Sequence, residues 1–335
     1  MLLIKFSTRA VFFVLITLAQ IFIIRRNSLF LVWVGLEIKM FFLLALIYQS
    51  SQSHRFFILN YRKLLVVVWY FLIQVVGRFL IVIRLLNNSL KFILLIGLLL
   101  KIGFYPLFYW VVFLYRSLTW GDIFITGYLR KVGLFFLFIK FMKRKGQLKS
   151  LIFLVFIMTY FFSLVGIYNH VKKLKILAGW SSLKNFSLLF LLRGFDLMLR
   201  RFLFLIYGVV FFFFCYIMYI KNWHFLIQII NYFSKCFFFM EFLIFSLLFL
   251  WFVGLPPFVI FWVKVIIIEY LRIQIDVWFF FGLRLLIFFQ ILVYLKIFGY
   301  LWFNFNLEYW LSLKNFLSLV IFVLLVVSQI LVFIL

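Results

Sequence analysis

Long apolar segments, separated by short basic connections, make up most of this 335-residue chain. Many of them reach about 18 residues, the length at which an apolar run indicates a membrane-spanning helix. A membrane β-barrel would show short alternating segments with a polar inner face, and no such alternation is visible. We expect an all-α polytopic membrane protein of about 11–12 transmembrane helices. The predicted spans are 10–24, 29–48, 64–86, 90–115, 122–142, 150–168, 175–193, 202–220, 236–253, 254–274, 277–300 and 313–335.

No low-complexity linker divides the chain, so we expect one membrane domain over residues 1–335. The stretch 221–235 is amphipathic and too short to span, and we expect it at the membrane interface. Lys5 and Arg9 precede the first apolar run, but no small-residue cleavage site follows. We therefore interpret this run as a retained first helix, not a signal peptide.

The three prolines of the chain fall inside two of the predicted spans. Pro106 lies in KIGFYP, and Pro256 and Pro257 lie in GLPPFVIFWVK. Proline removes a backbone donor and breaks a helix, so we predict broken helices near 95–115 and 254–274. Lys101 precedes its proline and Lys264 follows its pair. This mirrored order is typical of two inverted repeats with discontinuous helices near the midplane.

Ionisable residues inside the spans are the main candidates for function, because a charge at mid-bilayer depth costs a few kcal/mol. The candidates are Glu37, Lys101, Lys131 and Lys264. Glu37 has an alternative as the structural partner of a basic residue on a neighbouring helix. Lys101 has an alternative as a snorkelling lysine at a kink, and either Lys131 or its neighbour Arg130 has one as an ordinary anchor.

Arg78 and Arg84 also lie in a span, where each can snorkel or meet a carboxylate. Arginine does not lose its proton in proteins, so we assign both a structural role.

Buried lysines can act as proton carriers. Removal from water disfavours the ammonium form, and a nearby glutamate favours it again. A row of such groups, joined by water and hydroxyl or amide side chains, would conduct protons. Candidate connecting residues are Thr126, Tyr128, Ser181, Ser182 and Asn185. Redox or ATP chemistry that drives the transfer would come from partners.

The charge balance, with 34 Lys+Arg against 7 Asp+Glu, gives a formal net charge of +27. Most basic residues bracket the spans and do not form one solvated face, so we expect no nucleic-acid partner. Anionic lipids such as cardiolipin are the expected partners, at roughly 1 kcal/mol per residue near the surface. Acidic neighbouring subunits would serve the same purpose. An A+T-biased genome would also explain part of the lysine excess. Lysine and phenylalanine have A+T-rich codons and alanine has G+C-rich ones, and here phenylalanine is abundant and alanine rare.

No cofactor site is expected in this chain. Cys215 and Cys236 show no ligand spacing for zinc or iron–sulfur clusters. The sequence contains neither a G-x-G-x-x-G nor a Walker-type loop.

Four motifs in order resemble the subunit 2 family of NADH dehydrogenase, the antiporter-like proton-pumping subunits of respiratory complex I. They are LVWVGLEIKM, YFLIQVVGRFL, LLKIGFYPLFYWV and GLPPFVIFWVK. Between them lie GYLRKVGLFF and KLKILAGWSSLKNFS, which are similar to two further helices of the family. The resemblance covers roughly residues 30–275, and it is the order and spacing of the motifs that make it specific.

The resemblance implies an antiporter-like bundle in which protons pass through Glu37, Lys101, Lys131 and Lys264. It implies a multi-pass, organelle-encoded protein of the mitochondrial inner membrane, bound to other complex I membrane subunits. NADH would reduce ubiquinone elsewhere in the complex, with flavin and iron–sulfur clusters in partner subunits. Subunit 4 usually ends its second broken helix in glutamate, and subunit 5 is typically longer, so Lys264 favours subunit 2.

The sequence departs from the family at two histidine positions, which are Phe108 and Asn185 here. Water, Lys184 or Tyr109 would have to replace a histidine relay, with Ser181 and Ser182 nearby. A single predicted span precedes the Glu37 helix. The resemblance then implies the shortened form known in animals, or first helices supplied by another chain.

Two alternatives remain from the sequence. A free-standing secondary transporter would need an anion or zwitterion site at its half-helix ends, and no polar cluster surrounds Pro106 or Pro256. The other alternative is a membrane scaffold whose lysines are inert.

Overall fold

The computed structural model describes residues 2–25, 28–51, 57–86, 91–142, 149–191 and 197–235, with short helical pieces between 265 and 297. Within these residues every element of two or more residues is helical, and strand pairing is limited to an isolated bridge between Lys173 and Phe225. The predicted break near 254–274, with Pro256, Pro257 and Lys264, lies outside the described residues.

The chain divides into two compact units. Unit 1 comprises Met1–Thr159 and Ala178–Leu183, and unit 2 comprises Tyr160–Leu177 and Lys184–Leu335. Two helices, α8 (Lys149–Asn169) and α9 (Leu174–Leu191), contribute residues to both units.

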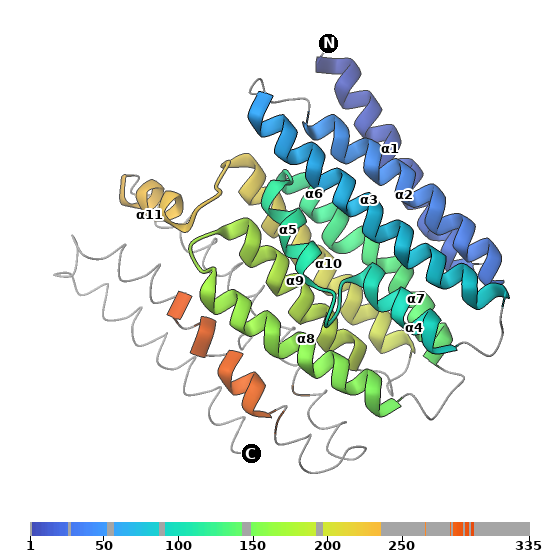
Figure 1. The fold of residues 1–335 in the computed structure, drawn as a ribbon. Coiled ribbons are helices and arrows are strands. Elements are labelled where there is room, and N and C mark those ends of the chain that lie inside the picture. The colour runs from blue at the N-terminus through green and yellow to red at the C-terminus, as the bar shows by residue number, and fades with distance from the viewer. Residues whose placement is uncertain are drawn as a thin grey trace. The chain divides into compact units, whose positions relative to one another are not determined.

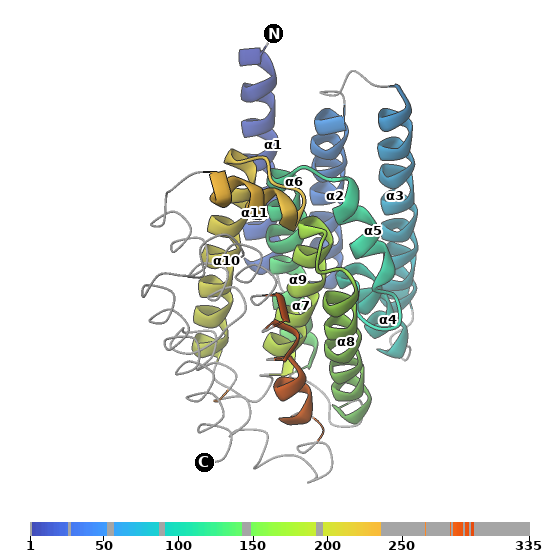
Figure 2. The ribbon, with the colours of Figure 1, turned by 90° about the vertical axis from the view of Figure 1, so that its left-hand side faces the viewer.

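Four helices open unit 1, each packed on the next. They are α1 (Leu2–Arg25), α2 (Leu29–Ser51), α3 (Phe57–Leu86) and α4 (Lys91–Ile102). Figures 1 and 2 show α1, α2 and α3 running side by side. Glycine allows the closest of these contacts: a Cβ added at Gly97 of α4 would lie 3.1 Å from the carbonyl oxygen of Gly77 in α3. Small residues at such crossings let membrane helices approach closely.

The helix that contains Lys101 stops at Ile102 and resumes as α5 (Tyr109–Ser117). Gly103 adopts a φ of +84°, which an L side chain rarely adopts. The amide of Phe104 donates to the carbonyl of Leu99 at 3.1 Å, and that of Gly103 donates to the same oxygen at 2.8 Å. This glycine cap ends α4 before Pro106 is reached. Gly103 therefore sets the end of α4, and Pro106 prevents a new helix from starting directly after it.

The next transmembrane segment is continuous but irregular. It comprises α6 (Trp120–Phe124), a π-helical turn η1 (Ile125–Leu129) and α7 (Arg130–Met142). Thr119 caps its start, because the Thr119 side chain accepts from the amide of Asp122. Single π turns inside α-helices occur frequently at functional sites. Here the turn directly precedes two adjacent basic residues.

Unit 2 contains the ends of α8 and α9 together with α10 (Leu197–Ile220) and α11 (Leu226–Lys235). Aromatic rings pack α9 on α10: the Phe186 ring centroid lies 5.5 Å from that of Phe204. The short α11 lies beyond the end of α10 (Figures 1 and 2). With 10 residues, α11 is too short to span a bilayer, as predicted for this stretch.

Four helices of the described residues are long and apolar enough to cross a bilayer. These segments are Phe30–Gln49, Leu64–Arg84, Ile152–Asn169 and Phe202–Ile220, close to the predicted spans 29–48, 64–86, 150–168 and 202–220. Helices suit this setting because all their backbone bonds are internal. The fold is that of an all-α polytopic membrane protein.

Candidate proton-transfer site

Four basic side chains are buried inside unit 1, whereas lysine and arginine usually lie on the surface of a protein. Lys39, Lys101 and Lys131 are 2%, 3% and 1% exposed, and Arg130 is 5% exposed. Lysine and arginine are almost never fully buried unless they are paired. Each of these four side chains therefore needs a stabilising environment, and the structure supplies a different one to each.

Glu37 on α2 forms an ion pair with Arg78 on α3, in which Arg78 Nη1 donates to Glu37 Oε2. Each side chain is 14% exposed. The partner of Glu37 is thus the arginine that the sequence placed in a structural role.

Lys39 is held by backbone carbonyls of the irregular segment. Its Nζ donates to the carbonyl of Leu129 at 3.0 Å and to that of Arg130 at 2.7 Å. Gln20 of α1 donates to the same Leu129 carbonyl. These acceptors lie where η1 passes into α7, at the point where the hydrogen-bonding pattern of the helix changes. The π turn thereby provides carbonyl partners for a buried cation.

Arg130 lies against aromatic faces. Its Cζ is 4.5 Å from the ring centroid of Trp110 and 5.6 Å from that of Tyr70. Such cation–π contacts stabilise a desolvated cation by about 2 kcal/mol. Arg130 is therefore a buried cation and not an exposed anchor.

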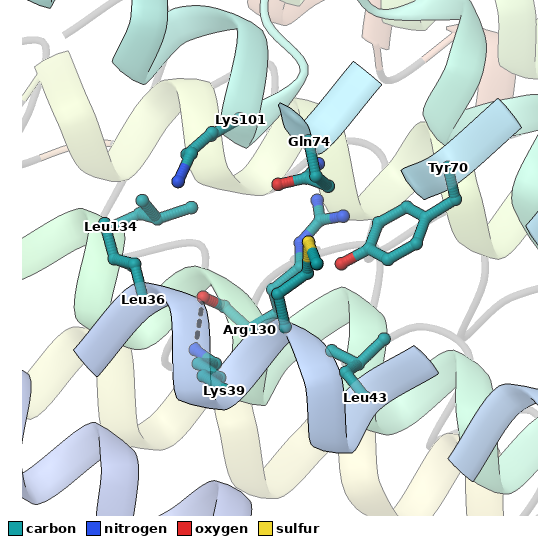
Figure 3. A pocket seen from close by; sticks show the side chains of 9 residues that line it. Leu36, Lys39, Leu43, Tyr70, Gln74, Lys101, Arg130 and Leu134 are labelled. Atoms are coloured by element: carbon teal, nitrogen blue, oxygen red, sulfur yellow. Dashed lines mark hydrogen bonds between the residues drawn. The ribbon is translucent and has the colours of Figure 1, made fainter. Parts of the chain in front are cut away.

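A small cavity lies among these groups, shown in Figure 3. Its volume is ≈ 20 Å³, above the roughly 10–15 Å³ that one water needs. Basic side chains reach it from three helices: Lys39 of α2, Lys101 of α4 and Arg130 of α7. Tyr70 and Gln74 of α3 complete its polar lining. The cavity places the predicted Lys101 in contact with a space where water can bridge polar groups.

Lys131 belongs to a separate hydrogen-bonded group in unit 1. Its Nζ lies 3.4 Å from Ser182 Oγ, and Tyr115 OH lies 3.4 Å from the same oxygen. Ser182 Oγ also donates to the Gly179 carbonyl at 2.8 Å. All three side chains are buried. The structure thus brings together the predicted Lys131 and Ser182, with Tyr115 as an additional hydroxyl.

The remaining predicted relay residues have different surroundings. Ser181 is buried and donates to the carbonyl of Ala178 at 3.0 Å, within its own helix. Asn185 is 4% exposed and its amide atoms have no hydrogen-bond partner among the described residues. Tyr109 is 68% exposed and its ring stacks on Phe108, with centroids 4.3 Å apart. The roles of these residues in a relay stay predictions.

Unit 2 holds a further buried lysine. Lys184 is fully buried and donates to Tyr294 OH at 2.9 Å, with its Nζ 4.2 Å from the centroid of that ring. One turn earlier on the Tyr294 helix, Gln290 accepts a hydrogen bond from Tyr160. The sequence shows Lys184 as a lysine in an otherwise apolar span. Its partner could not be predicted, because Tyr294 is more than 100 residues away in the sequence.

Sequence reasoning did not assign a site role to five buried polar residues of unit 1. They are Gln20, Lys39, Gln74, Asp122 and Thr159. Asp122 was detectable as one of the seven acidic residues, and Gln20 and Gln74 as polar positions inside apolar runs. The partners of Lys39 were not detectable, because backbone carbonyls carry no sequence signal.

Comparison with known proteins finds no matching protein-family profile and no matching curated protein. Many chains of solved structures are similar to this one, and two of them illustrate the match. A chain of the membrane-bound sulfane sulfur reductase, an archaeal respiratory membrane complex, aligns with a TM-score of 0.67 at 17% identity, covering 96% of this chain and 73% of that one. A chain of respiratory complex I from Thermus thermophilus aligns with a TM-score of 0.68 at 16% identity, covering 87% and 69% respectively. The chain shares the all-α fold of membrane subunits from these respiratory complexes.

Proposed function

We propose that this chain is a proton-conducting membrane subunit of a complex I-type respiratory assembly. The fold supports this proposal, since both similar structures are respiratory membrane complexes. The observation that most supports the proposal is the burial of Lys101 and Lys131 inside one apolar unit. Lys101 lies beside a cavity that can hold water, and Lys131 lies beside the Ser182 hydroxyl. An inert scaffold would gain nothing from burying these lysines at a cost of a few kcal/mol each.

In this proposal Lys101 and Lys131 hold and release protons at Nζ. Lys101 faces a cavity large enough for a water, and Lys131 faces the hydroxyls of Ser182 and Tyr115. Hydroxyls and water both donate and accept hydrogen bonds, so either can pass a proton onward. Glu37 is paired with Arg78 on the neighbouring helix.

The finer assignment rests on the sequence motifs. We infer a subunit of the NADH dehydrogenase subunit 2 type, in the mitochondrial inner membrane, with Lys264 as the terminal proton carrier. Redox chemistry with NADH and ubiquinone would take place in other subunits, which would hold the flavin and iron–sulfur clusters. Acidic neighbouring subunits and cardiolipin would balance the net charge of +27.

Purification from native membranes under mild detergent tests the proposal. We expect recovery in a large assembly that contains flavin and iron–sulfur proteins and oxidises NADH. Recovery as a free-standing carrier would contradict it.

The substitution Lys264→Ala tests the terminal carrier. Proton pumping and coupled turnover should fall while assembly is retained, because the variant removes a proton-binding group. The matched control is Lys172→Ala, at an exposed lysine. Normal pumping by an assembled Lys264→Ala variant would remove Lys264 from the path.

A further inference from the structure

The cavity of Figure 3, which the proposed function treats as a place for water beside Lys101, also has an unusual balance of charge. Three basic side chains, Lys39, Lys101 and Arg130, line it and are at most 5% exposed. Lysine can shed its charge by losing a proton, but arginine cannot. At least one permanent positive charge therefore borders this cavity.

No carboxylate of unit 1 lines this cavity. Residues 1–159 and 178–183 contain two acidic side chains, Glu37 and Asp122. Glu37 is paired with Arg78, and Asp122 accepts from the hydroxyl of Thr119 at 2.6 Å. Neither lines the cavity. The aromatic faces beside Arg130 stabilise its charge but do not neutralise it.

Hydrogen-bonding capacity around the cavity points to the same kind of ligand. Arg130 Nε and Nη1 and Gln74 Nε2 are buried nitrogens without a partner among the described residues. Lys101 also lines the cavity and directs its ammonium group toward it (Figure 3). Buried donors without an acceptor cost about 1–3 kcal/mol each. A ligand that only accepts hydrogen bonds would satisfy them.

Size restricts the ligand further. The volume of ≈ 20 Å³ accommodates one particle of roughly the size of a water molecule. A phosphate or an organic carboxylate is too large for it. A metal cation is excluded by the surrounding positive charge, and a water molecule fits but leaves that charge unbalanced.

We propose that this cavity, between α2, α3, α4 and α7, binds a single halide-sized inorganic anion. Arg130 supplies the permanent charge and Lys101 supplies a second donor. Gln74 and Tyr70 complete the polar wall, and Lys39 adds positive charge while its own donors hold the Leu129 and Arg130 carbonyls. The bound anion favours the charged form of Lys101.

The test is anomalous diffraction at the bromide edge. The assembly purified from its membranes is crystallised with bromide replacing chloride throughout. We expect an anomalous peak in contact with the Arg130 guanidinium and the Lys101 ammonium. Wild-type crystals whose cavity shows water density and no anomalous peak would overturn the proposal.

Substitutions of Arg130 test whether its positive charge is what binds the anion. Arg130→Met should abolish the peak, and Arg116→Met, which removes an exposed cation, should leave it unchanged. Arg130→Lys serves as a second variant if Arg130→Met does not assemble, with at least a tenfold weaker bromide occupancy expected in a titration. A peak that persists unchanged in both Arg130 variants would contradict the assignment. Because the readout is bound bromide, the result does not depend on whether the chain conducts protons.

Discussion

At the scale of single residues, the membrane interior forces each buried charge to find a specific partner. Arg78 is paired with Glu37, Lys39 binds backbone carbonyls, Arg130 faces aromatic rings and Lys131 meets hydroxyls. These four kinds of partner differ in whether they can exchange a proton with the buried charge. A carboxylate or a hydroxyl can exchange a proton, whereas a carbonyl or a ring face can only hold a cation.

The Glu37–Arg78 pair gives a prediction for stability. Arg78→Met should lower the free energy of unfolding by about 3 kcal/mol, because it leaves a carboxylate unpaired in a largely buried setting. The double variant Glu37→Gln with Arg78→Met should recover most of that loss, since no isolated charge remains. Thermal unfolding midpoints of the purified variants give the ranking. A double variant as unstable as Arg78→Met alone would show that the pair is not the source of the loss.

Sequence reasoning identified Lys101 and Lys131 as buried, because each stands inside an apolar run with few other charges. It also anticipated that Glu37 could pair with a basic residue of a neighbouring helix. It did not identify the role of Lys39. The partners of Lys39 are carbonyls presented by a π turn, and the sequence pattern of an ordinary helix does not reveal such a turn.

At the scale of elements, glycine positions decide how closely helices approach and where one of them ends. Gly97 and Gly77 bring α4 against α3, the contact that positions Lys101. A Cβ added at Gly97 would lie 3.1 Å from both the Gly77 carbonyl oxygen and Leu80 Cβ. A backbone oxygen inside a helix cannot move aside as a flexible side chain can.

Gly97→Ala should therefore destabilise the protein by about 1–3 kcal/mol through overpacking. The matched control is Gly121→Ala, where an added Cβ meets nothing within 4 Å. Both variants replace a helical glycine by alanine, so both gain helix propensity and the difference between them reports packing. Differential scanning fluorimetry of the two variants measures the difference, and equal midpoints would refute close packing at Gly97.

Gly103 gives a second prediction at this scale. Its φ of +84° disfavours any L side chain, by about 1–2 kcal/mol. Gly103→Ala should weaken the cap of α4 and speed hydrogen exchange at the amides of Gly103 and Phe104, which donate to Leu99. Exchange at the amide of Ile123, which donates to Thr119, should stay as in the wild type. Unchanged protection at Gly103 and Phe104 would contradict the role of this glycine as the helix stop.

The sequence located the discontinuity through Pro106, and the structure places the end of α4 four residues earlier, at Ile102. The difference has a physical reason: proline forbids continuation of a helix, whereas glycine allows the backbone to reverse and cap it. The motif held both signals, and the proline was given the greater weight.

At the scale of the whole molecule, apolar length was enough to predict the fold class, because the bilayer leaves a helix few alternatives. The four described spans lie close to their predicted ranges. The cavity and the hydrogen bond between Lys131 and Ser182 could not be predicted, since both depend on contacts between segments distant in sequence. Chains of two respiratory membrane complexes share this fold.

The central claim is that the buried lysines carry protons during turnover. Its most direct test is the number of protons taken up per NADH oxidised, measured in sealed vesicles that contain the assembly with Lys101→Met or Lys131→Met. Methionine keeps most of the side-chain volume and removes the proton-binding group, and Lys172→Met at an exposed position is the control. The account predicts that both buried variants assemble and pump fewer protons per NADH than the control. An unchanged ratio in both assembled variants would contradict it.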